Sequence, residues 1–160
     1  MEKVTIRPVG AAEMPLLDTA LRALSEDLGD PHRADVAALC AAATGPCPAF
    51  HALLAVSGDA ARGAVLFSPC FSTVRGIAGL YVSDLWVSRA ARGTGLGRGL
   101  LAAAAARAHR LWNAGYLRLD VYDDSAGAQG FYDRLGLAPM AGQRTLALAG
   151  DGFDRLKGEA

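Results

Sequence analysis

The sequence predicts one α/β domain of the mixed α+β type, in which helices pack on a single mixed β-sheet. Three observations lead to this fold class. The chain has 160 residues, of which 52% are hydrophobic, enough for one sizeable core and too short for a second domain. Segments with strand-like alternation and segments with helical spacing follow one another along it. Their order combines hairpin-like strand pairs with helical crossovers, which argues against a uniformly doubly wound sheet.

Turn residues separate the expected elements along the whole chain. Leucines at helical spacing mark the first helix, and Gly29 ends it just before Pro31. Residues 80–87 hold the strongest run of sheet-forming side chains. In order, we expect strand 3–8, helices 11–28 and 32–43, strands 50–56, 62–67 and 78–87, helix 96–112, strand 116–122, helix 125–135, strands 137–140 and 144–149, and a tail or short helix over 151–160.

Charge and cysteine content argue against several classes of protein. Sixteen Lys and Arg balance sixteen Asp and Glu, so neither nucleic acid nor an anionic membrane is an expected partner. The charged N-terminus lacks the apolar run of a signal peptide, and no stretch approaches the ~18 apolar residues of a membrane span. Cys40, Cys47 and Cys70 show no CxxC spacing. We therefore expect a reduced, cytoplasmic protein without a metal site.

A glycine-rich turn separates the strongest expected strand from the longest expected helix. Its glycines, at positions 93, 95, 97 and 99, let the backbone approach a ligand closely. The following helix presents free N–H groups and a partial positive charge, which together favour phosphate oxygens. Arg92 and Arg98 would add charge at the rim. A plain glycine-rich connector with solvated arginines is the alternative.

Two other phosphate-binding motifs fit this turn poorly. A Walker loop ends in Gly-Lys-Ser/Thr, and no lysine lies near the turn. A G-x-G-x-x-A spacing begins at Gly97, and Asp120 follows at the end of the next strand, as in a dinucleotide fingerprint. That spacing, however, places its glycines inside the expected helix instead of directly after the strand.

Two segments resemble the signature of the GNAT superfamily of N-acetyltransferases. Arg92, Gly95 and Gly97 match the family's Arg/Gln-x-x-Gly-x-Gly/Ala. Residues 125–137 resemble its Asn-x-x-Ala-x-x-Phe-Tyr-x-x-x-Gly-Phe, with Tyr132 at the tyrosine. The resemblance covers nearly the whole chain. It implies one GNAT domain over residues 1–160, with a sheet of six to seven strands flanked by about four helices and a V-shaped splay between its fourth and fifth strands.

The resemblance also implies acetyl-CoA as the acetyl donor. The pantetheine arm would pair with backbone groups of the strand before the turn, and main-chain N–H groups of the turn would hold the diphosphate. Ser125 stands where the family has an Asn that helps to bind the CoA arm. The residues so assigned to acetyl-CoA are Trp86, Val87, Ser88, Arg92, Gly93, Thr94, Gly95, Leu96, Gly97, Arg98 and Ser125.

Acetyl transfer to an amine needs a base, an oxyanion donor and a proton for the leaving thiolate. A lysine-like amine, with a pKa of about 10.4, is almost wholly protonated at pH 7. Asp84, in an apolar strand, is the best candidate to attract the ammonium and take its proton, although it could simply face water. An N–H exposed by a bulge near Val87 would stabilise the oxyanion. Tyr132 matches the family's proton donor; the alternative is a packing role.

These residues predict an acetyl-CoA-dependent N-acetyltransferase. The acceptor would be the primary amine of a small molecule, such as a polyamine or diamine, attacking the thioester directly in a ternary complex. A protein N-terminus or lysine, or a non-catalytic acyl-CoA-binding module, is the alternative. Asp120, Asp123 and Asp124 could form an anionic wall for a cationic acceptor. Pairing through residues 144–149 would give a homodimer.

Overall fold

The computed structural model describes residues 3–158. The described chain divides into two units, one that runs up to Tyr122 and one that begins at Asp123. The first unit contains a β-sheet and three α-helices, and the second contains two short α-helices. A single domain over residues 1–160 stays a prediction, and its first and last two residues lie outside the described range.

Five strands of the described chain form one mixed sheet, in the order β1-β2-β3-β4-β5. The pairs from β1 to β4 are antiparallel, and β4 and β5 are parallel. The mixed sheet predicted from the sequence is therefore confirmed. The strands are β1 (Thr5–Pro8), β2 (His51–Ser57), β3 (Ala60–Ser72), β4 (Ile77–Val87) and β5 (Leu117–Leu119).

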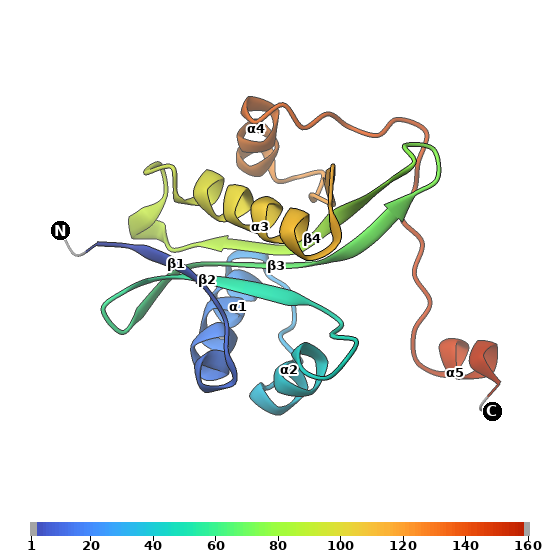
Figure 1. The fold of residues 1–160 in the computed structure, drawn as a ribbon, viewed down its shortest axis with the longest axis horizontal. Coiled ribbons are helices and arrows are strands. Elements are labelled where there is room, and N and C mark those ends of the chain that lie inside the picture. The colour runs from blue at the N-terminus through green and yellow to red at the C-terminus, as the bar shows by residue number, and fades with distance from the viewer. Residues whose placement is uncertain (1–2, 159–160) are drawn as a thin grey trace. The chain divides into compact units, whose positions relative to one another are not determined.

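Helices cover both faces of this sheet (Figure 1). A 3₁₀ turn, η1 (Ala11–Glu13), leads into α1 (Met14–Leu28), which packs against β3, β4 and α2 (Val36–Ala43) on one face. The other face carries α3 (Leu96–Trp112), which contacts β2, β3 and β4. The bounds of α3 agree with those predicted from its sequence.

Each face of the sheet has its own apolar layer. Leu17 of α1 packs with Leu54 of β2 and Leu66 of β3, and burying such side chains is a main source of folding free energy. On the other face, the ring of Phe67 lies 6.1 Å from that of Trp112 at the end of α3. There Gly63 permits close packing of α3, because a Cβ on it would lie only 2.7 Å from the Leu100 side chain.

Several element boundaries differ from the sequence-based expectation. Helix α2 begins at Val36 and not at residue 32, because the Asp35 carboxylate accepts a hydrogen bond from the Ala38 amide and caps the helix there. Strand β3 continues to Ser72, where a loop was expected, because it stays paired with β4 along one long hairpin.

The predicted strands 137–140 and 144–149 are wrong. The second unit holds α4 (Ala126–Arg134) and α5 (Asp151–Lys157), and the described chain has no strand between them, so the sheet has five strands and not six or seven. Leu146 and Leu148 alternate as in a strand but are 89% and 55% exposed. A strand needs a neighbour to pair with, and the sequence pattern alone does not supply one. The predicted tail 151–160 includes α5; its last two residues lie outside the described range.

Candidate active site

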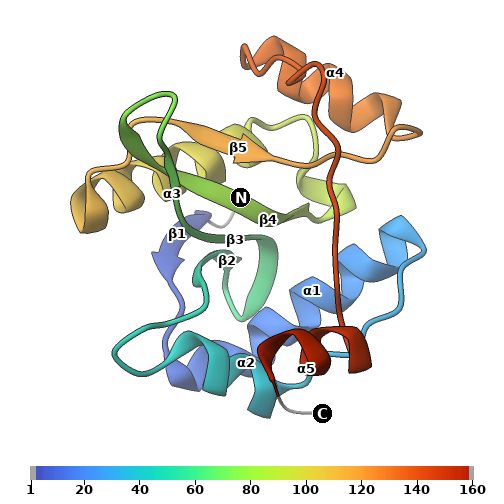
Figure 2. The same ribbon diagram turned by 90° about the vertical axis from the view of Figure 1, so that its right-hand side faces the viewer.

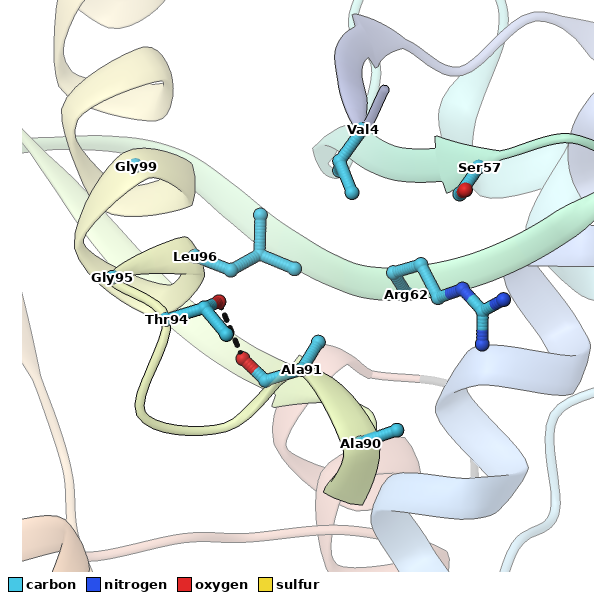
Figure 3. A pocket seen from close by; sticks show the side chains of 9 residues that line it. All are labelled: Val4, Ser57, Arg62, Ala90, Ala91, Thr94, Gly95, Leu96 and Gly99. Atoms are coloured by element: carbon cyan, nitrogen blue, oxygen red, sulfur yellow. Dashed lines mark hydrogen bonds between the residues drawn. The ribbon is translucent and has the colours of Figure 1, made fainter. Parts of the chain in front are cut away.

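The turn after β4 holds two glycines in the left-handed region of backbone conformation. A short 3₁₀ helix, η2 (Arg89–Ala91), follows Ser88, and Gly93 and Gly95 then have φ values of 78° and 86°. A Cβ on either glycine would meet nothing within 4 Å, so backbone conformation and not crowding favours glycine there. The Thr94 hydroxyl donates a 2.7 Å hydrogen bond to the Ala91 carbonyl and closes the turn (Figure 3).

The backbone amides of this turn are available to a ligand. Within residues 3–158, no backbone hydrogen bond outside regular elements is donated by residues 93–98, and the first amide used by the helix is that of Gly99, which donates to the Gly95 carbonyl. These amides lie at the N-terminus of α3, where the helix dipole adds a partial positive charge. Such an array of donors suits the oxygens of a diphosphate.

The Arg92 side chain lies on the protein and does not extend toward solvent as a free charge at the rim. Its Nε donates to the Val87 carbonyl at 3.0 Å, and its other end forms an ion pair with Asp27 of α1. Arg89 binds the second oxygen of the same carboxylate at 3.2 Å. Partial burial raises the pKa of Asp27, but the two guanidiniums outweigh it, and the net shift is downward. Arg98 remains exposed.

Strand β4 has an open edge beyond its middle. β5 pairs with β4 only from Leu80 to Val82 (Figure 2), so in the described chain the rest of β4 up to Val87 has no strand partner on the side away from β3. This geometry agrees with the splay expected between the fourth and fifth strands. The bulge in β4 lies at Ser83, four residues before the expected position, because Phe67 pairs with Val82 while Leu66 pairs with Asp84.

Backbone alternation decides which residues of β4 face the open edge. The Ser88 amide donates to the Arg62 carbonyl of β3 at 2.9 Å, so the backbone groups of Ser88 and Trp86 face β3, and those of Val87 and Leu85 face the open edge. Of the three consecutive residues predicted for the pantetheine arm, Trp86, Val87 and Ser88, only Val87 faces that edge, and its N–H is free there while its carbonyl accepts from Arg92. Leu85 was missed, because only the register of the sheet distinguishes alternate residues of a strand.

One buried polar atom near the turn lacks a partner. The Oγ atom of Ser88 is buried and forms no hydrogen bond with the described residues. A buried hydroxyl is usually satisfied by protein or by a ligand, because an unmade hydrogen bond there is unfavourable. The Ser88 hydroxyl is therefore consistent with a polar ligand that binds close to the end of β4.

Asp84 lies on the sheet face that α1 and α2 cover. It pairs with Leu66 of the apolar layer under α1, and it is half-buried. Tyr81 of the same strand donates a 2.8 Å hydrogen bond to Asp120, which follows β5. Burial, Asp120 and the charge of Asp84 all raise the pKa of Tyr81. The bulge thus gathers two carboxylates around one phenol.

Two residues beside these carboxylates, Tyr81 and Arg118, were not singled out from the sequence. Tyr81 looks like an ordinary sheet-forming residue, and only its hydrogen bond to Asp120 reveals its place. The Arg118 guanidinium lies 5.7 Å from the centre of the Tyr81 ring, since β4 and β5 pair these two residues directly. The sequence signal for both is weak, because it depends on the pairing of β4 with β5.

The second unit carries the predicted proton donor. Tyr132 lies in α4, with its ring centroid 5.1 Å from that of Phe131. Burial raises the pKa of Tyr132, which keeps its phenol protonated at neutral pH. Ser125 stands at the N-cap position of α4, but its side chain makes no capping hydrogen bond. The roles of Tyr132 and Ser125 toward acetyl-CoA stay predictions.

The described chain has neither the side-chain grouping of a metal centre nor the helix of a membrane span. Residues 3–158 contain no group of three or more His, Cys, Asp or Glu side chains placed to hold a metal ion. Over the same range, no helix combines the length and apolar character that crossing a bilayer requires.

Comparison with solved structures finds the same fold in several proteins of low sequence identity. An integron cassette protein from the mobile metagenome of V. cholerae matches with a TM-score of 0.76 and 22% identity, over 97% of this chain and 98% of the other. A ribosomal-protein-alanine N-acetyltransferase from Brucella melitensis matches with a TM-score of 0.74 and 18% identity, over 91% and 100%. An aminoglycoside acetyltransferase from an uncultured soil metagenomic sample, in complex with sisomicin, matches with a TM-score of 0.72 and 14% identity, over 91% and 94%.

Sequence comparison gives the family. A search of curated proteins finds no match. The sequence model of the acetyltransferase (GNAT) family matches residues 17–137, which include most of α1, the sheet strands β2 to β5, the glycine-rich turn and α4. Because this match spans well over half of the chain, and the mixed sheet and the turn agree with it, the chain belongs to the acetyltransferase (GNAT) family.

Proposed function

We propose that this chain transfers the acetyl group of acetyl-CoA to a primary amine of a small molecule, by direct attack of the amine in a ternary complex. The observation that carries the proposal is the row of unused backbone amides at residues 93–98, directly after the open edge of β4. The free amides suit the oxygens of a diphosphate, and the open strand edge suits an extended arm that contains amide groups.

The donor side of the site fits acetyl-CoA, which the family uses. The amides of residues 93–98 would hold the diphosphate, with Arg98 adding charge from solvent. The backbone groups of Leu85 and the free N–H of Val87 would pair with the pantetheine arm, while the Val87 carbonyl stays bound to Arg92. The buried Ser88 hydroxyl, which has no partner among the described residues, would gain one on binding. Acetyl-CoA supplies the activated acyl group, and the protein supplies its orientation.

The acceptor side of the site is acidic. Asp84 and Asp120 lie near one another around Tyr81, on the face under α1 and α2. An ammonium ion would be attracted to these carboxylates, and Asp84 would take its proton directly or through a water molecule. The neutral amine then attacks the thioester carbon. Acidic side chains favour a cationic small molecule, and one matching structure is named as an aminoglycoside acetyltransferase.

Two groups of the chain would stabilise the reacting atoms. A free β4 amide on the open edge, of Leu85 or Val87, would donate to the oxyanion that forms at the thioester carbonyl. As the C–N bond forms, the C–S bond breaks, a thiolate leaves, and the nitrogen releases its surplus proton to water. The phenol of Tyr132, kept protonated by its raised pKa, would supply the proton to that sulfur.

A thiol-release assay tests this proposal. Purified protein is incubated with acetyl-CoA and a panel containing diamines, polyamines, aminoglycosides and a peptide with a free N-terminal alanine. We expect amine-dependent release of CoA thiol with at least one small amine and none with the peptide. Tight binding of acetyl-CoA without turnover on any amine would instead identify a non-catalytic acyl-CoA-binding module. Turnover on the peptide alone would replace the small acceptor by a protein N-terminus.

A further inference from the structure

A hollow lies beside the turn, on the other side of β4 from the open edge. Its cavity measures about 650 Å³, a volume common for small-molecule sites. Val4, Ser57 and Arg62 of the β1–β2–β3 part of the sheet form one wall, and η2 with the first turn of α3 forms the other (Figure 3). Because β5 flanks β4 on its opposite side, this cavity is separate from the edge assigned to the pantetheine arm.

The cavity exists because small residues line it. Ala90 and Ala91 of η2 offer only methyl groups to it. Gly95 and Gly99 stand four residues apart, on one face of the beginning of α3, and neither has a side chain to fill the space. Most of the remaining lining is apolar, with Ser57 and Thr94 as hydroxyl-bearing residues, and the Leu96 side chain points into the hollow (Figure 3).

Among the described residues that line the cavity, Arg62 of β3 has the one charged side chain. Its guanidinium lies at the end of the side chain away from Leu96 (Figure 3), and the residue is half-buried. Among residues 3–158, no ion pair, hydrogen bond or ring contact involves this side chain. Arg89 and Arg92, by contrast, share Asp27. A planar guanidinium without a partner is well matched to a carboxylate, which it can bind through two parallel hydrogen bonds.

We propose that this cavity binds a small carboxylate with an apolar tail. The carboxylate would pair with the Arg62 guanidinium, and the tail would lie against Val4 and Leu96 over the two alanines. Apolar walls with one placed charge are the usual design of such sites, since the walls supply affinity and the charge supplies orientation. The ligand is neither the acetyl donor nor the amine acceptor of the proposed function.

Calorimetric titration of the full chain with octanoate tests the proposal, with octanol as the uncharged probe of similar shape. We expect octanoate to bind and octanol to bind about tenfold more weakly, because a hydrogen bond to a charged group is lost. Arg62→Gln should weaken the binding of octanoate by about the same factor and leave the affinity for octanol unchanged. Ala91→Phe should fill the hollow and abolish binding of both probes.

Controls separate this site from the acetyl-CoA site and from general charge effects. Arg110→Gln, at an exposed position near the end of α3, removes the same charge elsewhere and should leave octanoate affinity unchanged. Octanoate should also bind when the protein is saturated with CoA. Because the readout is binding, an inactive enzyme leaves the test valid. If Ala91→Phe fails to fold, Arg62→Gln and octanol still decide the question.

Four results would overturn the proposal. They are an absence of octanoate binding to the unmodified chain, equal affinity for octanol and octanoate, unchanged octanoate affinity in Arg62→Gln, and full displacement of octanoate by CoA. The last result would assign the probe to the acetyl-CoA site. None of the four bears on whether the chain transfers acetyl groups, which the thiol-release assay measures separately.

Discussion

The glycine-rich turn and the bulge at Ser83 are two departures from regular structure on either side of the end of β4, and they arise differently. The turn is set locally, by Gly93 and Gly95 with positive φ and by the start of α3. The bulge is set at a distance, by the pairing of β4 with β3. The comparison separates two roles. Local backbone chemistry shapes the donor side of the site, and sheet register shapes the acceptor side.

The largest expected effect comes from breaking the turn itself. Gly95→Val places a β-branched residue at φ 86°, a conformation that disfavours L side chains by about 1–2 kcal/mol. The turn should therefore move its amides away from the diphosphate. We expect loss of measurable acetyl-CoA binding by calorimetry, with the circular dichroism spectrum unchanged.

Gly45→Val is the matched control for that variant. Gly45 also has a positive φ, of 95°, and open space around its Cβ, but it lies in the loop after α2. It should suffer similar backbone strain and keep its acetyl-CoA affinity. Normal affinity in Gly95→Val would remove the turn from the donor site.

On the acceptor side, Asp84→Asn tests the role of the bulged strand. The amide keeps the size of the carboxylate but can neither attract an ammonium nor take its proton, so kcat/KM for the amine should fall by about 10²–10³-fold. The KM for acetyl-CoA should stay the same, as should the activity of Asp59→Asn in the exposed β2–β3 turn. An equal fall in acetyl-CoA affinity would show that donor and acceptor sides are not separate.

Tyr132→Phe tests the predicted proton donor, which belongs to neither the turn nor the bulge. Without the phenol, kcat should fall by about 10²-fold while acetyl-CoA affinity is unchanged. Because burial raises the pKa of Tyr132 above its usual 10.0, the wild-type rate should not decline through ionisation of this phenol below pH 10. Tyr116→Phe serves as the control, because it also removes a phenol, one that accepts a hydrogen bond from the Cys70 thiol. Its turnover should be unchanged. Unchanged turnover in Tyr132→Phe would exclude the role.

The smallest expected effect concerns the support of the turn by α1. Asp27→Asn weakens the hold on Arg89 and Arg92, and steady-state kinetics should show a KM for acetyl-CoA that is a few-fold higher, with kcat unchanged. Because both arginines are exposed, the loss of unfolding free energy at pH 7 should be no more than about 1 kcal/mol. An unchanged KM would mean that the turn holds its shape without Asp27.

The same variant has a characteristic pH dependence. The pKa of Asp27 in the folded protein lies below its usual 3.8, so its stabilising effect is complete above that value and is lost as the pH falls through the folded-state pKa. The difference in urea-unfolding free energy between wild type and Asp27→Asn should therefore be constant from pH 5 to 7 and shrink as the pH falls below 3.8.

The features that sequence predicted well are those determined by neighbouring residues. Leucines at helical spacing predicted α1, and α3 begins and ends at the residues expected from the sequence, 96 and 112. The splay of β4 from β5 was expected through the family resemblance and agrees with the short β4–β5 pairing. The two strands expected after α4 failed, because alternation at Leu146 and Leu148 indicates a strand without specifying a neighbour.

The side chains around the site were harder to predict than the backbone. Arg92 was expected at the phosphate rim, yet its nearest partners, Asp27 and the Val87 carbonyl, come from elements far apart in sequence. Tyr81 and Asp120 meet only because β5 returns beside β4. The cavity at Arg62 depends on small residues of η2 and of the start of α3. A local sequence pattern does not predict that such residues leave a space between them.

The ion pairs of Arg89 and Arg92 with Asp27 also affect how tightly the acetyl donor can be bound. A loop that must become ordered when its ligand arrives loses conformational entropy, and that loss subtracts from affinity. Here the ion pairs fasten both ends of the 3₁₀ segment to α1 before anything binds. The amides of the turn are thereby preorganised, so more of the attraction between backbone and diphosphate is retained as binding free energy.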